Sequence, residues 1–566
     1  MTTQEIQKTV GRILGFGVPL TSLFLITSGV SDPVNVTKMT VAGGVGIAGL
    51  LLFIVFGFKE NRVKFRSTLF ISVLFLLAGL NAVILSNAPL AQNLYGAYGR
   101  NTGLLTYVFM VGVLLCALMM ETEKNFTTLV YGLVVTGIVN VIYCAWVLAF
   151  GDFIVWSNPY GNILGLFGNP NFISAFLGMF ITTSIALAFK SDMRAWKRFS
   201  LIFLSFLAFF EILQSHAIQG LVVTLGGLTI IGFYFVYAKS SSWVIPSFYL
   251  GTATVIGILA VLGTLQKGPL TFVYKRSVSL RGSYWHAGID MGLQNPFHGV
   301  GFDTYGDWYR RSRPPVALVD MPGVNIMSNA SHNVVIDFFA SGGWPLLLSY
   351  IAILILAIRS ILKVTQKVRT FDPIFVALAA TWMCYQVQSL ISINQVGLTV
   401  WGWALTGALI SYEQLVFSGN IPSLTEKKTS RNVQINAGSP ISPGLVAAVG
   451  VAIGLFVAAP AINSEITWQG ATQSRNLDNI QKALIPSFMN PASSFKYAQA
   501  VNLLQNSNLS DLAHDYALTA TRYNPDYFDA WKQLYYIQNV TTEEKEAALE
   551  NMTRLDPQNP DVTQLR

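Results

Sequence analysis

The residues best suited to chemistry are two arginines in a polar stretch that interrupts long apolar runs. Arg276 and Arg281 stand in the segment YKRSVSLRGSYWHAGIDMGLQNPFHGVGFDTYGDW, ahead of a turn-forming region from 295 to 301. A guanidinium is always charged and forms paired hydrogen bonds to phosphate oxygens, which suits a diphosphate better than an ammonium group does. Interfacial arginines also extend to lipid headgroups. The pattern therefore indicates either a diphosphate site or an interfacial anchor.

A histidine follows near the end of the same stretch, in the string SNASHNVVIDFF. Ser328, Asn329 or Ser331 is expected to cap a helix there, which places His332 in the first helical turn. The positive end of the helix dipole disfavours imidazolium, so we expect a neutral ring that can accept a proton. The same N–H groups favour a nearby anion. The alternative is a histidine that caps the helix or packs at an interface.

Other polar side chains gather on the same predicted face of the chain. Asp337 lies one turn deeper among apolar residues, where a carboxylate is costly, so it is either functional or a group that orients Asn333. Further polar residues end other apolar runs on this face: Arg100, Asn101, Asn169, Asn171, Gln214, His216, Gln388, Ser392, Asn394 and Gln395. One-sided placement fits an enzyme that receives a lipid-borne substrate, whereas transporters concentrate polar groups near the membrane midplane.

Metal ligation is not indicated by the sequence. The histidines predicted on this face match no ligand spacing; they are His216, His286, His298 and His332. No Asp-x-Asp or Glu-x-Asp pair occurs in the early loops of this face to hold a divalent ion. We therefore expect no metal and no cofactor, so that positive side chains would stabilise any phosphate leaving group.

The elements that must position these residues are membrane helices. The 566-residue chain is 52% hydrophobic and only 11% charged, which places most of it in a bilayer. A helix needs roughly 20 apolar residues to cross the hydrocarbon, and about thirteen such runs recur. The predicted spans are 11–30, 40–57, 68–87, 103–120, 127–150, 172–189, 199–214, 219–238, 243–265, 333–358, 374–392, 397–416 and 444–462. We expect an all-α membrane domain over 1–462.

Lysine and arginine set the expected orientation. They concentrate in alternate connections, whereas the other short connections hold only Lys38 and Arg100. Because cations are retained on the cytoplasmic side, the N-terminus is predicted inside and the C-terminus outside a bacterial inner membrane. The net charge of +8 is largely a topology signal and argues little for nucleic acid. Lys8 and Arg12 precede a first helix that we expect to stay uncleaved. All three cysteines fall inside predicted spans as packing residues.

The tail over 463–566 is polar and predicted to form a separate helical domain outside the membrane. Asn490-Pro491, Asn524-Pro525 and Asp556-Pro557 recur close to the period of about 34 residues seen in tetratricopeptide repeats. Only about two units fit, fewer than independent stability requires, so we expect the tail to dock on the membrane domain. It either recruits a protein partner or shapes an acceptor path, or it is a set of surface helices without a partner.

The loop from 267 to 331 is long enough to be functional. It carries more cations than carboxylates, on the face where membrane topology normally removes cations. The cations are Lys267, Lys275, Arg276, Arg281, Arg310, Arg311 and Arg313, and the carboxylates are Asp290, Asp303, Asp307 and Asp320. An anionic ligand at the outer membrane face would explain the excess.

Four strings in this order resemble the O-antigen ligase and polymerase superfamily of polytopic membrane glycosyltransferases. They are GRNTGLLTY at 99–107, GNPNF at 168–172, RGSYWHAGIDMGLQNPFHGVG at 281–301 and SHNVVIDFFASGGWPLL at 331–347. The resemblance covers roughly 70–462. It implies a type C glycosyltransferase architecture and metal-independent, inverting transfer of a glycan from a polyprenyl (undecaprenyl) diphosphate carrier. Arg281 and Arg276 would hold the diphosphate, Arg100 would be a further phosphate contact, and His332 would activate the acceptor hydroxyl.

The acceptor stays open at this level. Lipid A core would define a ligase, another lipid-linked repeat a polymerase, and a protein hydroxyl an O-oligosaccharyltransferase. A transporter or flippase of lipid-linked sugars is the alternative of another class, in which the arginines bind the diphosphate but no bond breaks.

Overall fold

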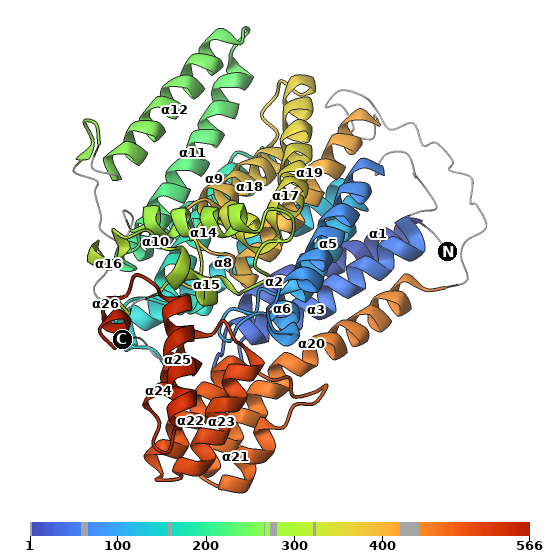
Figure 1. Cartoon of the computed structure of the whole chain (residues 1–566). Coiled ribbons are helices and arrows are strands. Elements are labelled where there is room, and N and C mark those ends of the chain that lie inside the picture. The colour runs from blue at the N-terminus through green and yellow to red at the C-terminus, as the bar shows by residue number, and fades with distance from the viewer. Residues whose placement is uncertain are drawn as a thin grey trace.

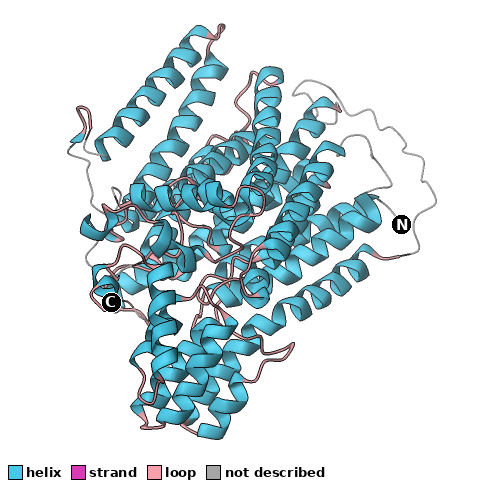
Figure 2. Ribbon diagram, viewed as in Figure 1, coloured by secondary structure: helices cyan, strands magenta, loops and turns pink. Residues whose placement is uncertain are grey.

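A computed structural model describes residues 3–57, 66–156, 158, 161–264, 267–271, 280–320, 324–325, 327–418 and 441–565. These ranges form helices joined by loops, and no strand lies among them (Figure 2). Most helices build one large bundle. The last ones form a smaller group at one end of it, at the bottom of Figure 1.

Seven helices of the described chain are long and apolar enough to cross a membrane. The protein is therefore a multi-pass helical membrane protein, with a core of packed apolar side chains from most of these helices. The seven are α3 with its continuation η2 (Asn35–Gly57), α5 (Arg66–Leu85), α8 (Glu123–Phe150), α9 (Pro170–Ala188), α11 (Ile218–Lys239), α17 (Val334–Lys367) and α20 (Pro443–Ser474).

Helices also occupy the other predicted spans, but they are shorter or less apolar. Two of them are apolar but too short by this criterion. The number of crossings, thirteen, thus stays a prediction. These helices are α1 (Thr3–Arg12) with η1 (Ile13–Gly17) and α2 (Val18–Leu23), α7 (Leu104–Leu118), α10 (Ala195–Gln214), α12 (Val244–Thr264), α18 (Pro373–Ser389) and α19 (Val396–Phe417).

Glycines let the central helices approach closely. A Cβ atom on Gly112 of α7 would lie 2.0 Å from the carbonyl oxygen of Gly46 in α3. A Cβ atom on Gly454 of α20 would lie equally close, 2.0 Å, to the carbonyl oxygen of Gly43. Small residues at helix crossings bring backbones into van der Waals contact, the main source of helix association in a lipid environment. Helix α3 is thereby held between α7 and α20.

The turn-forming region from 295 to 301 packs against α17 at a break in that helix. Gly343 has φ +62°, which interrupts the helix. The N–H groups of Val300 and Gly301 donate to the carbonyls of Ala340 (2.8 Å) and Ser341 (3.0 Å). Two of the strings that carry the family resemblance are therefore packed against each other, and they fix α14 (Arg281–Gln294) beside the start of α17.

The tail consists of short helices that pack in consecutive pairs. Helix α22 packs on α23, and α24 packs on α25. The repeated positions Asn490, Asn524 and Asp556 are all buried and each precedes a helix of this region. The spacing seen in the sequence is therefore a spacing of helices, while membership in the tetratricopeptide class stays a prediction. The helices are α21 (Leu477–Leu484), α22 (Ser494–Asn506), α23 (Ser510–Tyr523), α24 (Phe528–Tyr536), α25 (Thr542–Leu555) and α26 (Pro560–Thr563).

The tail docks on the segment that contains α15 (Tyr305–Ser312) through ion pairs, and its helices lie beside α15 in Figure 1. Arg310 Nη1 and Arg313 Nη2 lie 3.1 and 2.7 Å from the two carboxylate oxygens of Asp556. Arg311 Nη2 lies 3.1 Å from Asp526 Oδ1. The expectation that an anionic ligand explains the excess cations is thus wrong for these three arginines, because carboxylates of the tail neutralise them.

Candidate functional site

The site forms where the first turn of α14 meets the start of α17. Arg281 is the first residue of α14, and Tyr284 follows one turn later. The Tyr284 ring stacks on the His332 imidazole, with centroids 5.4 Å apart and planes inclined by 29°. The guanidinium groups of Arg281 and Arg100 both lie within electrostatic range of His332. Three predicted site residues are therefore brought together from distant parts of the chain.

The cap of α17 differs from the prediction. Asn333 is the N-cap, and its Oδ1 accepts hydrogen bonds from the N–H groups of Val335 (3.0 Å) and Ile336 (3.2 Å). His332 therefore precedes the helix instead of lying in its first turn, and its φ of +56° is left-handed. Asparagine is a preferred N-cap, and its position after the histidine moves the helix start. Asn333 also joins this helix end to the residue that follows α18, because its Nδ2 donates to the Leu390 carbonyl (3.1 Å).

The His332 ring is held in its neutral form by its surroundings. Burial, followed by the positive charges of Arg281 and Arg100, lowers the pKa of His332 to about 4. The predicted neutral state thus has a different cause from the helix dipole on which it was based. Neither ring nitrogen has a hydrogen-bond partner among the residues that the structure describes. A neutral, unpaired imidazole can accept a proton at neutral pH.

An anionic ligand would change the pKa of His332. A diphosphate bound by Arg281 and Arg100 would offset their charges, which removes the electrostatic part of the pKa depression at His332. The pKa would then rise towards the working pH, where a general base is most effective. Burial also lowers the pKa of the Arg281 guanidinium, which favours pairing with an anion. Arg276, the other arginine assigned to the diphosphate, lies outside the described residues.

Arg100 is positioned by a tight loop that Asp303 organises. The Asp303 carboxylate accepts hydrogen bonds from the N–H groups of Ala97 (3.0 Å) and Thr102 (2.9 Å). Arg100 Nε lies 3.4 Å from Asp303 Oδ1, and its Nη1 donates to the Asn329 carbonyl. In the sequence, Asp303 is only one of the carboxylates of the loop from 267 to 331. Its structural role depends on contacts between residues about 200 positions apart, which local sequence does not indicate.

Asp337 acts on the segment that carries His332. Its Oδ1 accepts a hydrogen bond from the N–H group of Ser331 (2.8 Å), and its buried Oδ2 has no partner among the described residues. Ser331 Oγ in turn donates to the carbonyl of Asn333 (2.8 Å). Asp337 therefore orients the backbone before His332, and not the Asn333 side chain that the sequence suggested.

Only some of the polar residues predicted at one end of the helices are linked to the site by hydrogen bonds. Asn35 Nδ2 donates to the Gly99 carbonyl (2.8 Å), and Gln395 Nε2 donates to Asn35 Oδ1 (3.3 Å). Together with the Asn333–Leu390 bond, these contacts connect the Arg100 loop, the start of α17 and the α18–α19 connection. Asn169 instead caps α9 by accepting from the N–H group of Asn171 (2.8 Å). No bond links Gln214 or His216 to this group in the described ranges.

Lys38 is a polar residue that the sequence analysis did not single out as a site. Its side chain is fully buried, and Nζ donates to the carbonyls of Ser22 and Phe24, the latter at 3.4 Å. These carbonyls end α2, where a cation is favourable. Lys38 therefore closes a helix end within the bundle.

Comparisons with known proteins add no family to this description. No protein-family model matches the chain, and no curated protein matches it. Within the described residues, no three His, Cys, Asp or Glu side chains cluster as ligands for a metal ion. The fold and site define a multi-pass helical membrane protein that presents arginines and a neutral histidine at one end of a long membrane helix.

The charge coupling between Arg281 and His332 leads to a first prediction. Arg281→Gln is expected to raise the pKa of His332 from about 4, while keeping it below its ordinary 6.5 because burial persists. The measurement is an NMR titration of histidine-labelled protein in detergent, with the His332 signal assigned by its loss in a His332→Gln variant. Arg369→Gln, at the opposite end of α17, is the control. An unchanged His332 pKa in Arg281→Gln contradicts the coupling.

Proposed function

We propose that this protein transfers a glycan from a polyprenyl diphosphate carrier to an acceptor hydroxyl. The observation that carries the proposal is the neutral His332 beside two arginines at the end of α17. This reaction requires a base that deprotonates the acceptor hydroxyl. It also requires cations that stabilise the departing diphosphate. The resemblance of the strings at 99–107, 281–301 and 331–347 to O-antigen ligases and polymerases supports the same activity.

The reaction follows from these roles as a single displacement. His332 takes the proton of the acceptor hydroxyl as its oxygen attacks the anomeric carbon, and the bond from that carbon to the diphosphate oxygen breaks. The electron pair leaves with the lipid diphosphate. Arg281 and Arg100, with Arg276 assigned the same role by resemblance, stabilise the charge that develops on it. Attack opposite the leaving group inverts the anomeric configuration, and the arginines replace a metal ion.

The proposed topology places this site on the outer face of a bacterial inner membrane. Thirteen crossings with a cytoplasmic N-terminus put 267–331 and the tetratricopeptide-like tail outside, in a type C glycosyltransferase architecture. The distribution of Lys and Arg along the sequence supports this orientation. Donor and acceptor would meet where the lipid carrier reaches the outer leaflet. The acceptor is lipid A core, a growing polysaccharide or a protein, and the tail would contact it or a partner protein.

The second prediction tests the reaction itself. Full-length protein in detergent is expected to release polyprenyl diphosphate and form a glycosidic bond of inverted configuration when it is given an undecaprenyl-diphosphate-linked oligosaccharide and acceptors of the three classes. EDTA should leave the rate unchanged, because no step uses a metal. Loss of transfer in EDTA would overturn the metal-free mechanism. Movement of the intact lipid-linked sugar across vesicles, without transfer, would instead identify a transporter or flippase.

A further inference from the structure

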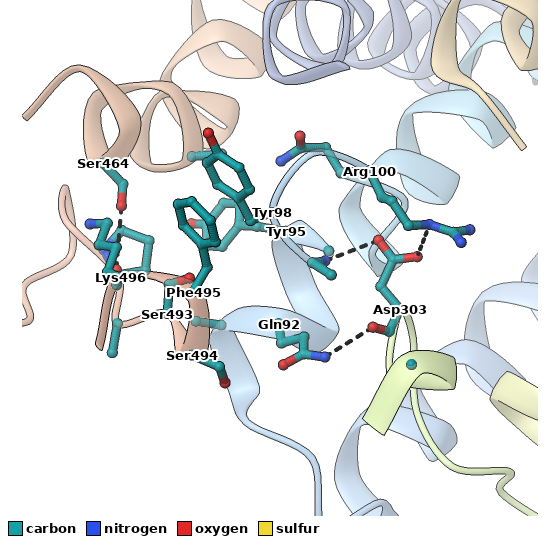
Figure 3. A pocket seen from close by; sticks show the side chains of 18 of the residues that line it. Gln92, Tyr95, Tyr98, Arg100, Asp303, Ser464, Ser493, Ser494, Phe495 and Lys496 are labelled. Atoms are coloured by element: carbon teal, nitrogen blue, oxygen red, sulfur yellow. Dashed lines mark hydrogen bonds and ion pairs between the residues drawn. The ribbon is translucent and has the colours of Figure 1, made fainter. Parts of the chain in front are cut away.

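A cavity of about 290 Å³ separates the tail from the membrane domain. One wall is α6 (Leu90–Tyr95) with the loop that follows it, and the opposite wall is the end of α20 with the start of α22 (Figure 3). Its volume lies just below the range of drug-sized ligand pockets, about 300–1,000 Å³, so it suits a short saccharide segment. Six aromatic rings contribute to the lining, and two of them, Tyr98 and Phe495, stack on each other with centroids 3.8 Å apart. The six are Tyr95, Tyr98, Trp468, Phe495, Tyr523 and Tyr527.

The polar groups of this cavity do not favour an anion. Three carboxyl groups line it, those of Asp303, Asp307 and Glu465, against two cations, Arg100 and Lys496. Arg100 pairs with Asp303 and directs its guanidinium away from the aromatic rings in Figure 3. Lys496 Nζ donates to Asn490 Oδ1 at 2.6 Å, and burial lowers the pKa of Lys496 to about 8. A phosphorylated ligand would therefore meet more carboxyl groups than cations, and the Lys496 ammonium already lies within electrostatic range of Glu465.

The same lining suits a neutral sugar. The C–H faces of a sugar ring pack on aromatic faces, and its hydroxyls bond to carboxyl, amide and hydroxyl groups. Asn101 also lines the cavity; it is 5% exposed, and its buried Oδ1 has no partner in the described ranges. A buried polar atom of this kind costs free energy until a ligand satisfies it.

The cavity lies next to the loop that carries Arg100 of the proposed site. Phe495 and Tyr527 also line a groove of about 500 Å³ between α22 and α24, so these two side chains separate the cavity from a groove on the tail. On its other side, the loop from 96 to 102 carries Tyr98 into the cavity, whereas its Arg100 points away from the aromatic rings (Figure 3). Arg100 lies within electrostatic range of His332. A chain held in the cavity would lie between the tail and the reacting groups.

We propose that this cavity is a binding site for an uncharged glycan, and that the bound glycan is the acceptor chain. The glycan specificity rests on the lining alone. Its role as acceptor rests on the proposed function. A peptide would instead be expected to use the amide-rich groove, where Gln499, Asn502 and Gln533 offer hydrogen-bond partners along an extended backbone.

The third prediction is a binding experiment on full-length protein in detergent without donor. Calorimetry with tetrasaccharides of glucose, galactose, mannose and N-acetylglucosamine is expected to detect at least one ligand. Tyr98→Ala should weaken that ligand about tenfold, since a lost aromatic contact costs up to about 1.5 kcal/mol. Tyr536→Ala, which removes an exposed ring from the groove only, is the matched control and should bind normally. Thermal unfolding confirms that both variants are folded.

Several outcomes would overturn the assignment. They are no binding of any neutral tetrasaccharide, equal affinity in Tyr98→Ala, or Tyr98-dependent binding of a phosphorylated oligosaccharide or a serine-rich peptide. Binding that depends on Tyr536 and not on Tyr98 would place the ligand in the groove. Failure of the proposed function would look different. The protein would then still bind the tetrasaccharide but would transfer no glycan.

Discussion

Replacing His332 is expected to slow glycan transfer by about 10²- to 10⁴-fold, the usual contribution of a positioned general base. The residue has φ +56°, where alanine is strained, whereas asparagine tolerates this conformation. His332→Asn therefore removes the base with less backbone strain than His332→Ala. Both variants should still bind the lipid-linked donor, because Arg281 and Arg100 are unchanged. Single-turnover rates and donor titrations separate the chemical step from binding.

His286→Ala is the matched control for this prediction. His286 lies on α14 near the site but is exposed, so its loss should leave the rate within about twofold of wild type. Transfer at the wild-type rate by His332→Asn would contradict the role of His332 as base. Loss of donor binding in that variant would show that the histidine belongs to the diphosphate site instead.

Much of this arrangement could be predicted from local sequence, because membrane helices and caps are local features. Apolar runs indicated where helices lie, and the strings at 281–301 and 331–347 indicated which segments approach His332. The predicted start of α17 is wrong because four residues between 328 and 333 can each cap a helix: Ser328, Asn329, Ser331 and Asn333. Asn333 is selected by its additional bond to Leu390, which comes from another helix. Local patterns do not contain that contact.

The charges of the loop from 267 to 331 also show what local sequence cannot predict. The seven cations count as one surplus in the sequence, but the described ones have different surroundings, and Lys267 is exposed. Arg281 faces His332, whereas Arg310, Arg311 and Arg313 face the tail. Their partner Asp556 was noticed only as a marker of the repeat. A single sequence reports how many charges a loop carries, but their partners are set by folding.

Removal of the Asp556 carboxylate is expected to undock the tail. Asp556 and the two arginines it pairs with, Arg310 and Arg313, are buried, and breaking a buried ion pair on one side costs about 3–5 kcal/mol. Asp556→Ala should therefore speed hydrogen exchange of the α15 amides by about 10²- to 10⁴-fold, measured by mass spectrometry. Transfer should fall with it, because α15 packs against α14, which carries Arg281.

Two further variants separate charge from general damage. Asp561→Ala, at the exposed edge of the same interface, loses one hydrogen bond to Asn325 and should change exchange by less than about tenfold. Asp556→Ala combined with Arg313→Met removes one of the stranded charges and should recover part of the protection, since a buried cation without its partner is the main cost. If the α15 amides exchange at the same rate in Asp556→Ala as in Asp561→Ala, the ion pairs do not hold the tail. The tail would then be free to move relative to α15, and the cavity between them could not be a preformed site.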